Sequence, residues 1–138
     1  MILASAAVTG AAGYAQRITA GSGHAFSSDE PERRGGTDTG PAPFDLLLGS
    51  LGACTAITLR MYAERKQWQL GRIDIALRLV KEGDGPMRID RRISVSEPIN
   101  DEQQAKLLEI ADKTPVTKAL ATGVPIQTVF ETSTQPAR

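Results

Sequence analysis

Hydrophobic residues in the first part of the chain fall into three short runs with glycine between them. The runs cover residues 4–9, 14–20 and 24–28, and the glycine-rich breaks lie at 10–13 and 21–23. Short runs bounded by glycine are typical of strands that are joined by tight turns. The pattern therefore predicts a three-stranded β-meander. Residues 28–43 follow without helical or strand period, and we expect a long surface loop of the kind that often carries function.

The longest predicted element is a helix over residues 44–66, about 33 Å long at 1.5 Å per residue. Its first half carries Asp45 as the only charge and is apolar nearly all round, so it needs cover on every side. Each interior glycine costs a helix roughly 1 kcal/mol, which close packing against another helix would offset. That helix could belong to a second subunit or to the same chain. Four small residues offer the contact surface: Gly49, Ser50, Gly52 and Ala53.

Two segments after this helix alternate between apolar and polar positions. They cover residues 70–80 and 89–95, and a period of two indicates half-buried strands. The segment 82–86 between them is rich in glycine and acidic residues, which suits a turn. We therefore expect a β-hairpin.

Two helix start signals follow the hairpin. Asn100 is suited to the N-cap position and Gln103 to the capping box, so a helix is predicted over 101–113. Thr114 as N-cap and Pro115 at the first helical position then start a second, shorter helix.

Gly123 is suited to end the second helix, and an apolar segment follows it. Residues 124–131 are predicted as a last strand and residues 132–138 as a frayed end. The whole chain, 1–138, is thus expected to form a single domain of the α+β class: a three-stranded meander, a long central helix, a hairpin, two helices and a strand.

Composition narrows the range of partners. The chain has 138 residues with 16 basic and 16 acidic side chains, and the basic residues form no block. We therefore expect no nucleic-acid partner. A single cysteine excludes an intramolecular disulfide and fits a reducing cytoplasm. No signal peptide is recognisable, and no apolar run approaches the roughly 20 residues needed to span a bilayer, so no membrane partner is expected.

Candidate chemistry rests on Cys54, the only thiol. A free cysteine in an apolar helix can be a packed small hydrophobe, or a nucleophile if a cation, a helix N-terminus or hydrogen-bond donors stabilise its thiolate. Its sequence neighbours do not decide between the two. His24 is the only histidine, so a three-histidine zinc site is impossible, and we expect neither a metal nor a cofactor.

Several stretches resemble the OsmC/Ohr family, especially its OsmC-like branch. They read GGTDTGPAPFDLLL at 35–48, GACT at 52–55, TLRMYA at 58–63 and LLEIADKTPV at 107–116. The resemblance implies an intertwined homodimer with two long central helices and two active sites at the interface. It also implies that a thiolate reduces organic or fatty-acid hydroperoxides and becomes a sulfenic acid. A second cysteine then forms a disulfide with it, and an external dithiol reduces that disulfide. Cys54 matches the attacking cysteine.

Three positions depart from the family pattern. Thr114 stands where the family usually has the resolving cysteine of Cys-Pro-Val, so a two-cysteine cycle within one chain cannot occur. Its hydroxyl could cap the helix, or it could hydrogen-bond a thiolate or sulfenic acid. The family's activating glutamate, ten residues before the cysteine, is Phe44 here, with Asp45 next to it. Arg17 is the nearest candidate for the activating arginine of the N-terminal strands.

Two functions remain open from the sequence. One is a one-cysteine peroxidase, in which Cys54 becomes a sulfenic acid and an external thiol resolves it. The other is a non-enzymatic dimer that binds a hydrophobic small molecule in its interface cleft, with Cys54 only packed.

Overall fold

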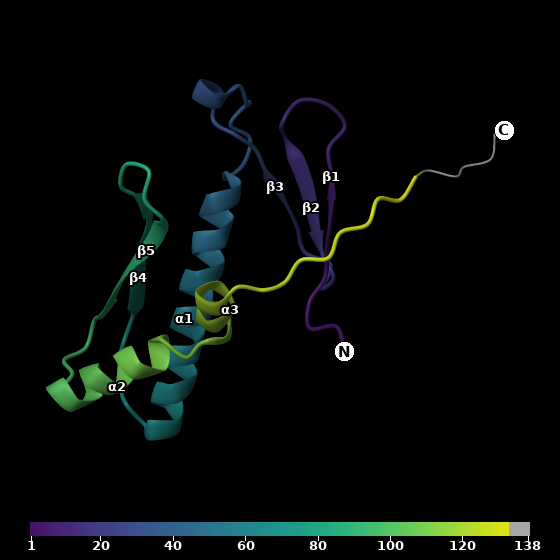
Figure 1. Ribbon diagram of the computed structural model, residues 1–138. Coiled ribbons are helices and arrows are strands. Elements are labelled where there is room, and N and C mark those ends of the chain that lie inside the picture. Colours follow the sequence, from purple (N-terminus) through teal and green to yellow (C-terminus); the bar gives the residue numbers. More distant parts are fainter. Residues whose placement is uncertain (133–138) are drawn as a thin grey trace.

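The N-terminal meander is confirmed. The computed structural model describes residues 1–132. It contains strands β1 (Ala6–Thr9), β2 (Gln16–Ala20) and β3 (Ala25–Ser28), which form an antiparallel sheet in the order β1-β2-β3 (Figure 1). The register places Val8 opposite Ile18 and Ile18 opposite Phe26. One row of apolar side chains thus crosses all three strands.

The loop after β3 is built around one buried carboxylate. Asp29 is 2% exposed and accepts hydrogen bonds from the hydroxyls of Thr37 (2.6 Å) and Thr39 (2.8 Å). The backbone N–H groups of the same two threonines and of Glu30 also donate to it. These donors, those of Thr37 first, hold the pKa of Asp29 well below its usual value. A side chain at Gly36 would collide with the backbone of Glu30, which explains the glycine there.

Helix α1 (Pro43–Lys66) follows this loop and forms the centre of the molecule. The hairpin β4 (Ile73–Lys81) and β5 (Met87–Val95) packs along one side of α1, and the two C-terminal helices lie across it (Figure 1). The buried core lies at the C-terminal half of α1. It consists of Leu59, Ala63, Leu70 and Leu107.

The predicted helix start signals are confirmed in α2 (Asp101–Ala111) and α3 (Pro115–Thr122). The Asn100 side chain accepts a hydrogen bond from the Gln103 backbone at 2.7 Å, and the Gln103 side chain accepts one from the Asn100 backbone. Thr114 caps α3 through its side chain. The first of these helices ends two residues earlier than predicted, because the chain must turn to present Thr114.

The predicted last strand over 124–131 is wrong for the single chain. This segment is irregular and extends away from the body in Figure 1. A strand needs a neighbour for its backbone hydrogen bonds, and the strands of the described residues pair only within their own sheets. Its apolar side chains are therefore exposed: Val124, Ile126, Val129 and Phe130. The predicted frayed end at 132–138 lies outside the described residues except for its first one.

The expectation that no segment could span a bilayer also needs correction. By length and composition alone α1 passes that test, with a mean hydropathy of 1.4 over its most apolar 18 residues. The hydropathy arises because the helix is apolar nearly all round. Only 28% of that stretch is buried in the single chain. The finding therefore points to apolar helix surface that the chain itself does not cover.

Candidate functional site

Cys54 lies near the middle of α1, at the border between a buried and an exposed side of the helix. Its neighbour Thr55 is fully buried, whereas Ala53 on the other side is exposed. The thiol is free and partly buried. Cys54 is thus neither a sealed core residue nor an open surface thiol. A small reactant could reach it from the exposed side.

The exposed side of α1 carries a stripe of small and apolar residues. Ile57 is 59% and Met61 51% exposed, although both are large hydrophobic side chains. We call the four residues at helical spacing the open stripe: Ser50, Ala53, Ile57 and Met61. Cys54 lies along its edge, so whatever covers the stripe also borders the thiol.

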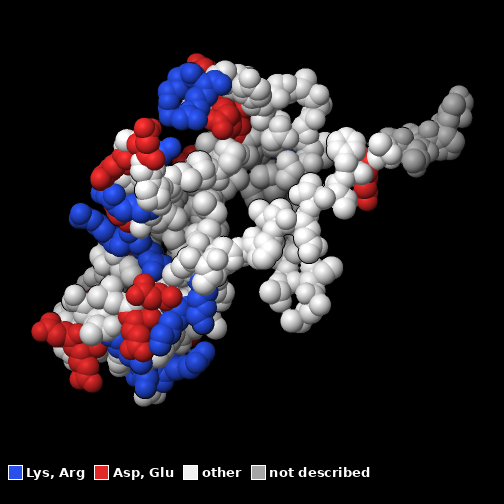
Figure 2. Space-filling view, in the orientation of Figure 1, with Lys and Arg blue, Asp and Glu red and all other residues white. Residues whose placement is uncertain are grey.

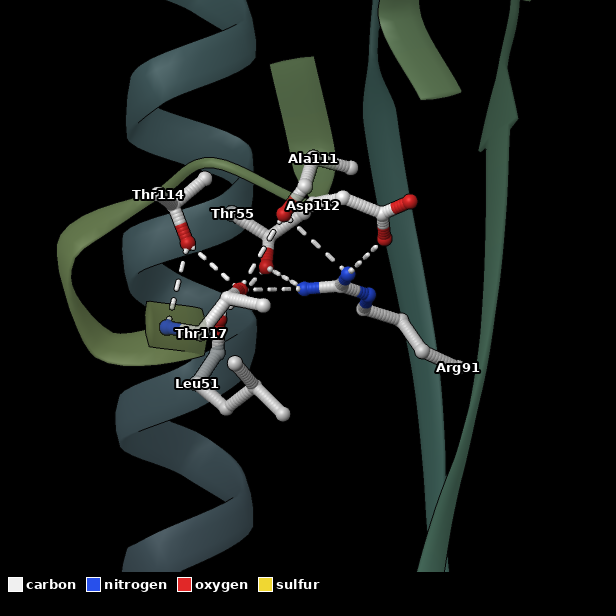
Figure 3. A network of polar contacts seen from close by, with 7 residues as sticks. All are labelled: Leu51, Thr55, Arg91, Ala111, Asp112, Thr114 and Thr117. Carbon is white, nitrogen blue, oxygen red and sulfur yellow. Dashed lines mark hydrogen bonds and ion pairs between the residues drawn. The ribbon is translucent and has the colours of Figure 1, made fainter. Parts of the chain in front are cut away.

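Arg91 occupies the buried side. In Figure 3 its guanidinium points from β5 toward α1 and toward the turn between α2 and α3. Its Nη1 atom donates to the Thr55 hydroxyl and to the Thr117 hydroxyl, both at 2.9 Å. Its Nη2 atom donates to the Ala111 carbonyl at 3.1 Å and lies 3.4 Å from an oxygen of Asp112. One side chain therefore connects three helices next to the turn that carries Cys54.

Thr114 belongs to the same network. It is fully buried, and its hydroxyl is 2.6 Å from the hydroxyl of Thr117, which in turn donates to the Ala111 carbonyl at 3.1 Å. Thr114 is thus linked to Thr55 through Thr117 and Arg91. This arrangement supports the capping role of Thr114, because its hydroxyl is already engaged within its own helix turn.

The structure does not bring the other two predicted residues to Cys54. Asp45 accepts a hydrogen bond from the Ala42 backbone at 3.1 Å and so caps the start of α1. It lies nine residues before the thiol, about 13.5 Å along the helix. Arg17 is on the exposed side of β2, and its side chain makes no hydrogen bond or ion pair with the described residues. An activating role for either residue stays a prediction.

Sequence reasoning missed Arg91, although a signal was present. The hairpin register places Ile75 opposite Ile93, Leu77 opposite Arg91 and Leu79 opposite Ile89. Arg91 therefore takes a core-facing position in an otherwise apolar row. An arginine at such a position needs internal hydrogen-bond partners, and a polar network could have been predicted on that ground.

The described residues contain no group of three or more histidine, cysteine or acidic side chains that could hold a metal ion. His24, the only histidine, is exposed on the turn before β3.

Solved structures with this fold come from several bacteria. A candidate osmotic stress induced and detoxification response protein from Psychrobacter arcticus is 21% identical, with 86% of this chain and 88% of that chain covered and a TM-score of 0.72. An OsmC-like protein from Mycoplasma pneumoniae is 15% identical, with 86% and 85% covered and a TM-score of 0.68. The organic hydroperoxide resistance protein OhrB of Bacillus subtilis is 23% identical, with 86% and 90% covered and a TM-score of 0.59.

These likenesses establish the α+β fold with its three-stranded sheet, long helix, hairpin and C-terminal helices. Comparison with curated protein sequences gives no match. The sequence profile of the family described as OsmC-like protein matches residues 36–129, which include α1 with Cys54, the hairpin with Arg91 and the Thr114 turn. The chain therefore belongs to the OsmC-like protein family.

Proposed function

We propose that this protein is a one-cysteine, thiol-dependent reductase of organic hydroperoxides that acts as a homodimer. The observation that carries the proposal is the position of Cys54. It is the only thiol, it is partly exposed, and it lies between the open stripe and the Arg91 network. Solved relatives named organic hydroperoxide resistance proteins share the fold and supply the substrate class.

The proposed cycle needs only Cys54 and an external thiol. The Cys54 thiolate attacks the distal peroxide oxygen, the O–O bond breaks, and the alkoxide takes up a proton to leave as an alcohol. Cys54 is then a sulfenic acid. A first external thiol forms a mixed disulfide with Cys54 and releases water. A second external thiol attacks that disulfide, restores Cys54 and leaves as the oxidised disulfide of the reductant.

The sulfenic acid of Cys54 must be resolved by an external thiol because the chain has no second cysteine. Thr114 stands at the family's resolving position and its buried hydroxyl cannot form a disulfide. A small thiol or dithiol is the reductant that could reach a partly buried sulfur. The protein is therefore proposed to accumulate the sulfenic acid whenever peroxide is present and the thiol is absent.

The homodimer is supported by the surface that the single chain leaves open. The accessible surface is 10879 Å², whereas a compact monomer of this size exposes about 6,900 Å². The excess is ample for an obligate dimer, which buries about 2,000–5,000 Å² in total. In Figure 2 charged side chains gather over the hairpin and α2, while the side with the N-terminal sheet and residues 124–131 is nearly uncharged. A second copy covering the open stripe would border Cys54.

The test is peroxide consumption with trapping of the oxidised thiol. An organic hydroperoxide is added with and without a small dithiol, and dimedone captures any sulfenic acid for intact-mass and peptide analysis. We expect one equivalent consumed without dithiol, repeated turnover with it, and dimedone on Cys54. Cys54→Ser should abolish all three. Equal consumption by Cys54→Ser contradicts the proposal.

A matched control tests whether the reactivity of Cys54 depends on its site or is that of any exposed thiol. Ser94 is exposed on β5, so Ser94→Cys in the Cys54→Ser background places a thiol outside the site. We expect Cys54 to react with the organic hydroperoxide at least about tenfold faster than this control thiol does. Equal rates, with slow alkylation of both, favour instead a non-enzymatic dimer in which Cys54 is only packed.

A further inference from the structure

A pocket of about 580 Å³ lies between the hairpin and helices α2 and α3. Its volume and its mostly apolar lining are typical of small-molecule sites. Cys54 is not among the residues that line it. Six leucine and isoleucine side chains form most of its apolar wall, and Met87 and two alanines complete it: Leu51, Leu79, Ile89, Ile93, Leu108 and Leu120.

One cation that lines this pocket, Arg91, is paired with a single carboxylate whose side chain is exposed. The Arg91 side chain is 13% exposed, and three of its four partners are neutral: two hydroxyls and a carbonyl. Among residues 1–132, the one charged partner of Arg91 is Asp112, at 3.4 Å and with a side chain that is 82% exposed. A largely buried guanidinium is better stabilised by a close carboxylate, which it binds with good geometry.

The second arginine of the pocket differs in this respect. Arg88 is 3.1 Å from Glu82 and 3.0 Å from Asp90, so two carboxylates already balance its charge. Arg91 is therefore the cation whose charge is incompletely matched. It lies next to the apolar wall.

We propose that this pocket binds an amphipathic monocarboxylate, that is, an apolar chain ending in a carboxylate. The carboxylate replaces Asp112 as the charged partner of Arg91, and the chain lies against the leucine and isoleucine side chains of the wall. Asp112 also lines the pocket, and its exposed carboxylate can turn to solvent. The site goes beyond the proposed peroxide reduction, since binding requires neither a peroxide nor Cys54.

Titration calorimetry with octanoate and with 1-octanol tests the proposal. The full chain with Cys54→Ser serves as the protein, so that loss of the peroxidase activity and loss of binding are distinguishable. Octanoate is expected to bind at least about tenfold more tightly than 1-octanol. Equal affinities overturn the proposal. Absence of octanoate binding, as would follow if the assembled dimer fills the pocket, also overturns it.

Asp112→Asn provides the decisive variant because the side chain is 82% exposed and its contact with Arg91 is long, at 3.4 Å. It removes the competing carboxylate, so octanoate affinity should rise several-fold while 1-octanol affinity is unchanged. Arg91→Gln should abolish the preference for octanoate. Leu120→Trp should lower the affinity for both ligands, because the larger side chain fills the pocket. Arg88→Gln should leave both affinities unchanged. Unchanged octanoate affinity in Asp112→Asn overturns the proposal even if Arg91→Gln fails to fold.

Discussion

Arg91 donates a hydrogen bond of 2.9 Å to Thr55, the residue that follows Cys54, across 36 positions of sequence. The contact joins the hairpin to the turn of α1 that carries the thiol. Because the same guanidinium also binds the α2–α3 turn, the surroundings of Cys54 depend on tertiary structure rather than on neighbouring residues.

Removal of this guanidinium should destabilise the fold. Arg91→Met removes the charged donor from the Thr55 hydroxyl and from the Ala111 carbonyl, although Thr55 still donates to the Leu51 carbonyl and Ala111 still accepts from Thr117. The free energy of unfolding should therefore fall by about 2 kcal/mol. Arg91→Lys should lower the free energy of unfolding by less, since lysine retains the charge and some of the hydrogen-bond donors. Urea unfolding at fixed protein concentration measures both. Arg72→Ala is the control: its pair with Asp74 is exposed and should contribute less than about 1 kcal/mol.

The Thr114 hydroxyl should matter for stability more than for thiol chemistry. Thr114→Val removes a buried helix cap and should cost about 1–2 kcal/mol, whereas Thr114→Ser should be nearly neutral. The rate of Cys54 alkylation should differ less than about threefold between the two variants. A much larger change in that rate for Thr114→Val alone would show that the hydroxyl contacts the thiolate.

Acid should weaken the loop that precedes α1. The folded-state pKa of Asp29 is lowered from 3.8 by hydrogen bonds, so its stabilisation is complete above about pH 4 and is lost as the pH falls through the folded value. Asp29→Asn should therefore be less stable than the wild type at neutral pH, and the difference should shrink below pH 4. Thermal unfolding at several pH values shows this. Asp84→Asn, in the exposed hairpin turn, should leave the profile unchanged.

A charge on the open stripe should dissociate the proposed dimer. Ile57→Glu places a carboxylate in apolar surroundings and should raise the dimer dissociation constant by about a hundredfold. Gln69→Glu adds the same charge at an exposed position off the stripe and should have no effect. Sedimentation velocity measures the assembly state. A wild-type protein that is monomeric at micromolar concentration contradicts the dimer.

Local signals predicted most of this fold correctly. Alternation gave the hairpin, and the residues at Asn100, Gln103 and Thr114 gave the helix starts, because caps and periodicity depend only on nearby residues. The buried role of Asp29 could not be read in this way. Its two threonine donors lie eight and ten residues away in a segment without helical or strand period.

The last predicted strand was wrong because a local signal was present without a tertiary partner. The apolar pattern of 124–131 favours a strand, but a strand exists only where another strand offers its backbone. Within residues 1–132 no strand lies beside this segment. For the candidate site, the sequence pointed to Cys54 and Thr114, whose roles stay predictions. Thr55, Thr117 and Arg91 could not be predicted, because they meet only through the tertiary contact of the hairpin with α1 and α3.

The extended segment 124–131 has a consequence for the lifetime of an unassembled chain. Val129 and Phe130 are 84% and 91% exposed, and irregular exposed backbone is where proteases cut first. A chain that has folded but not yet found a covering partner would therefore lose its C-terminal end before its core is attacked. Protein levels in the cell would then depend on how quickly such cover is found as well as on the stability of the core.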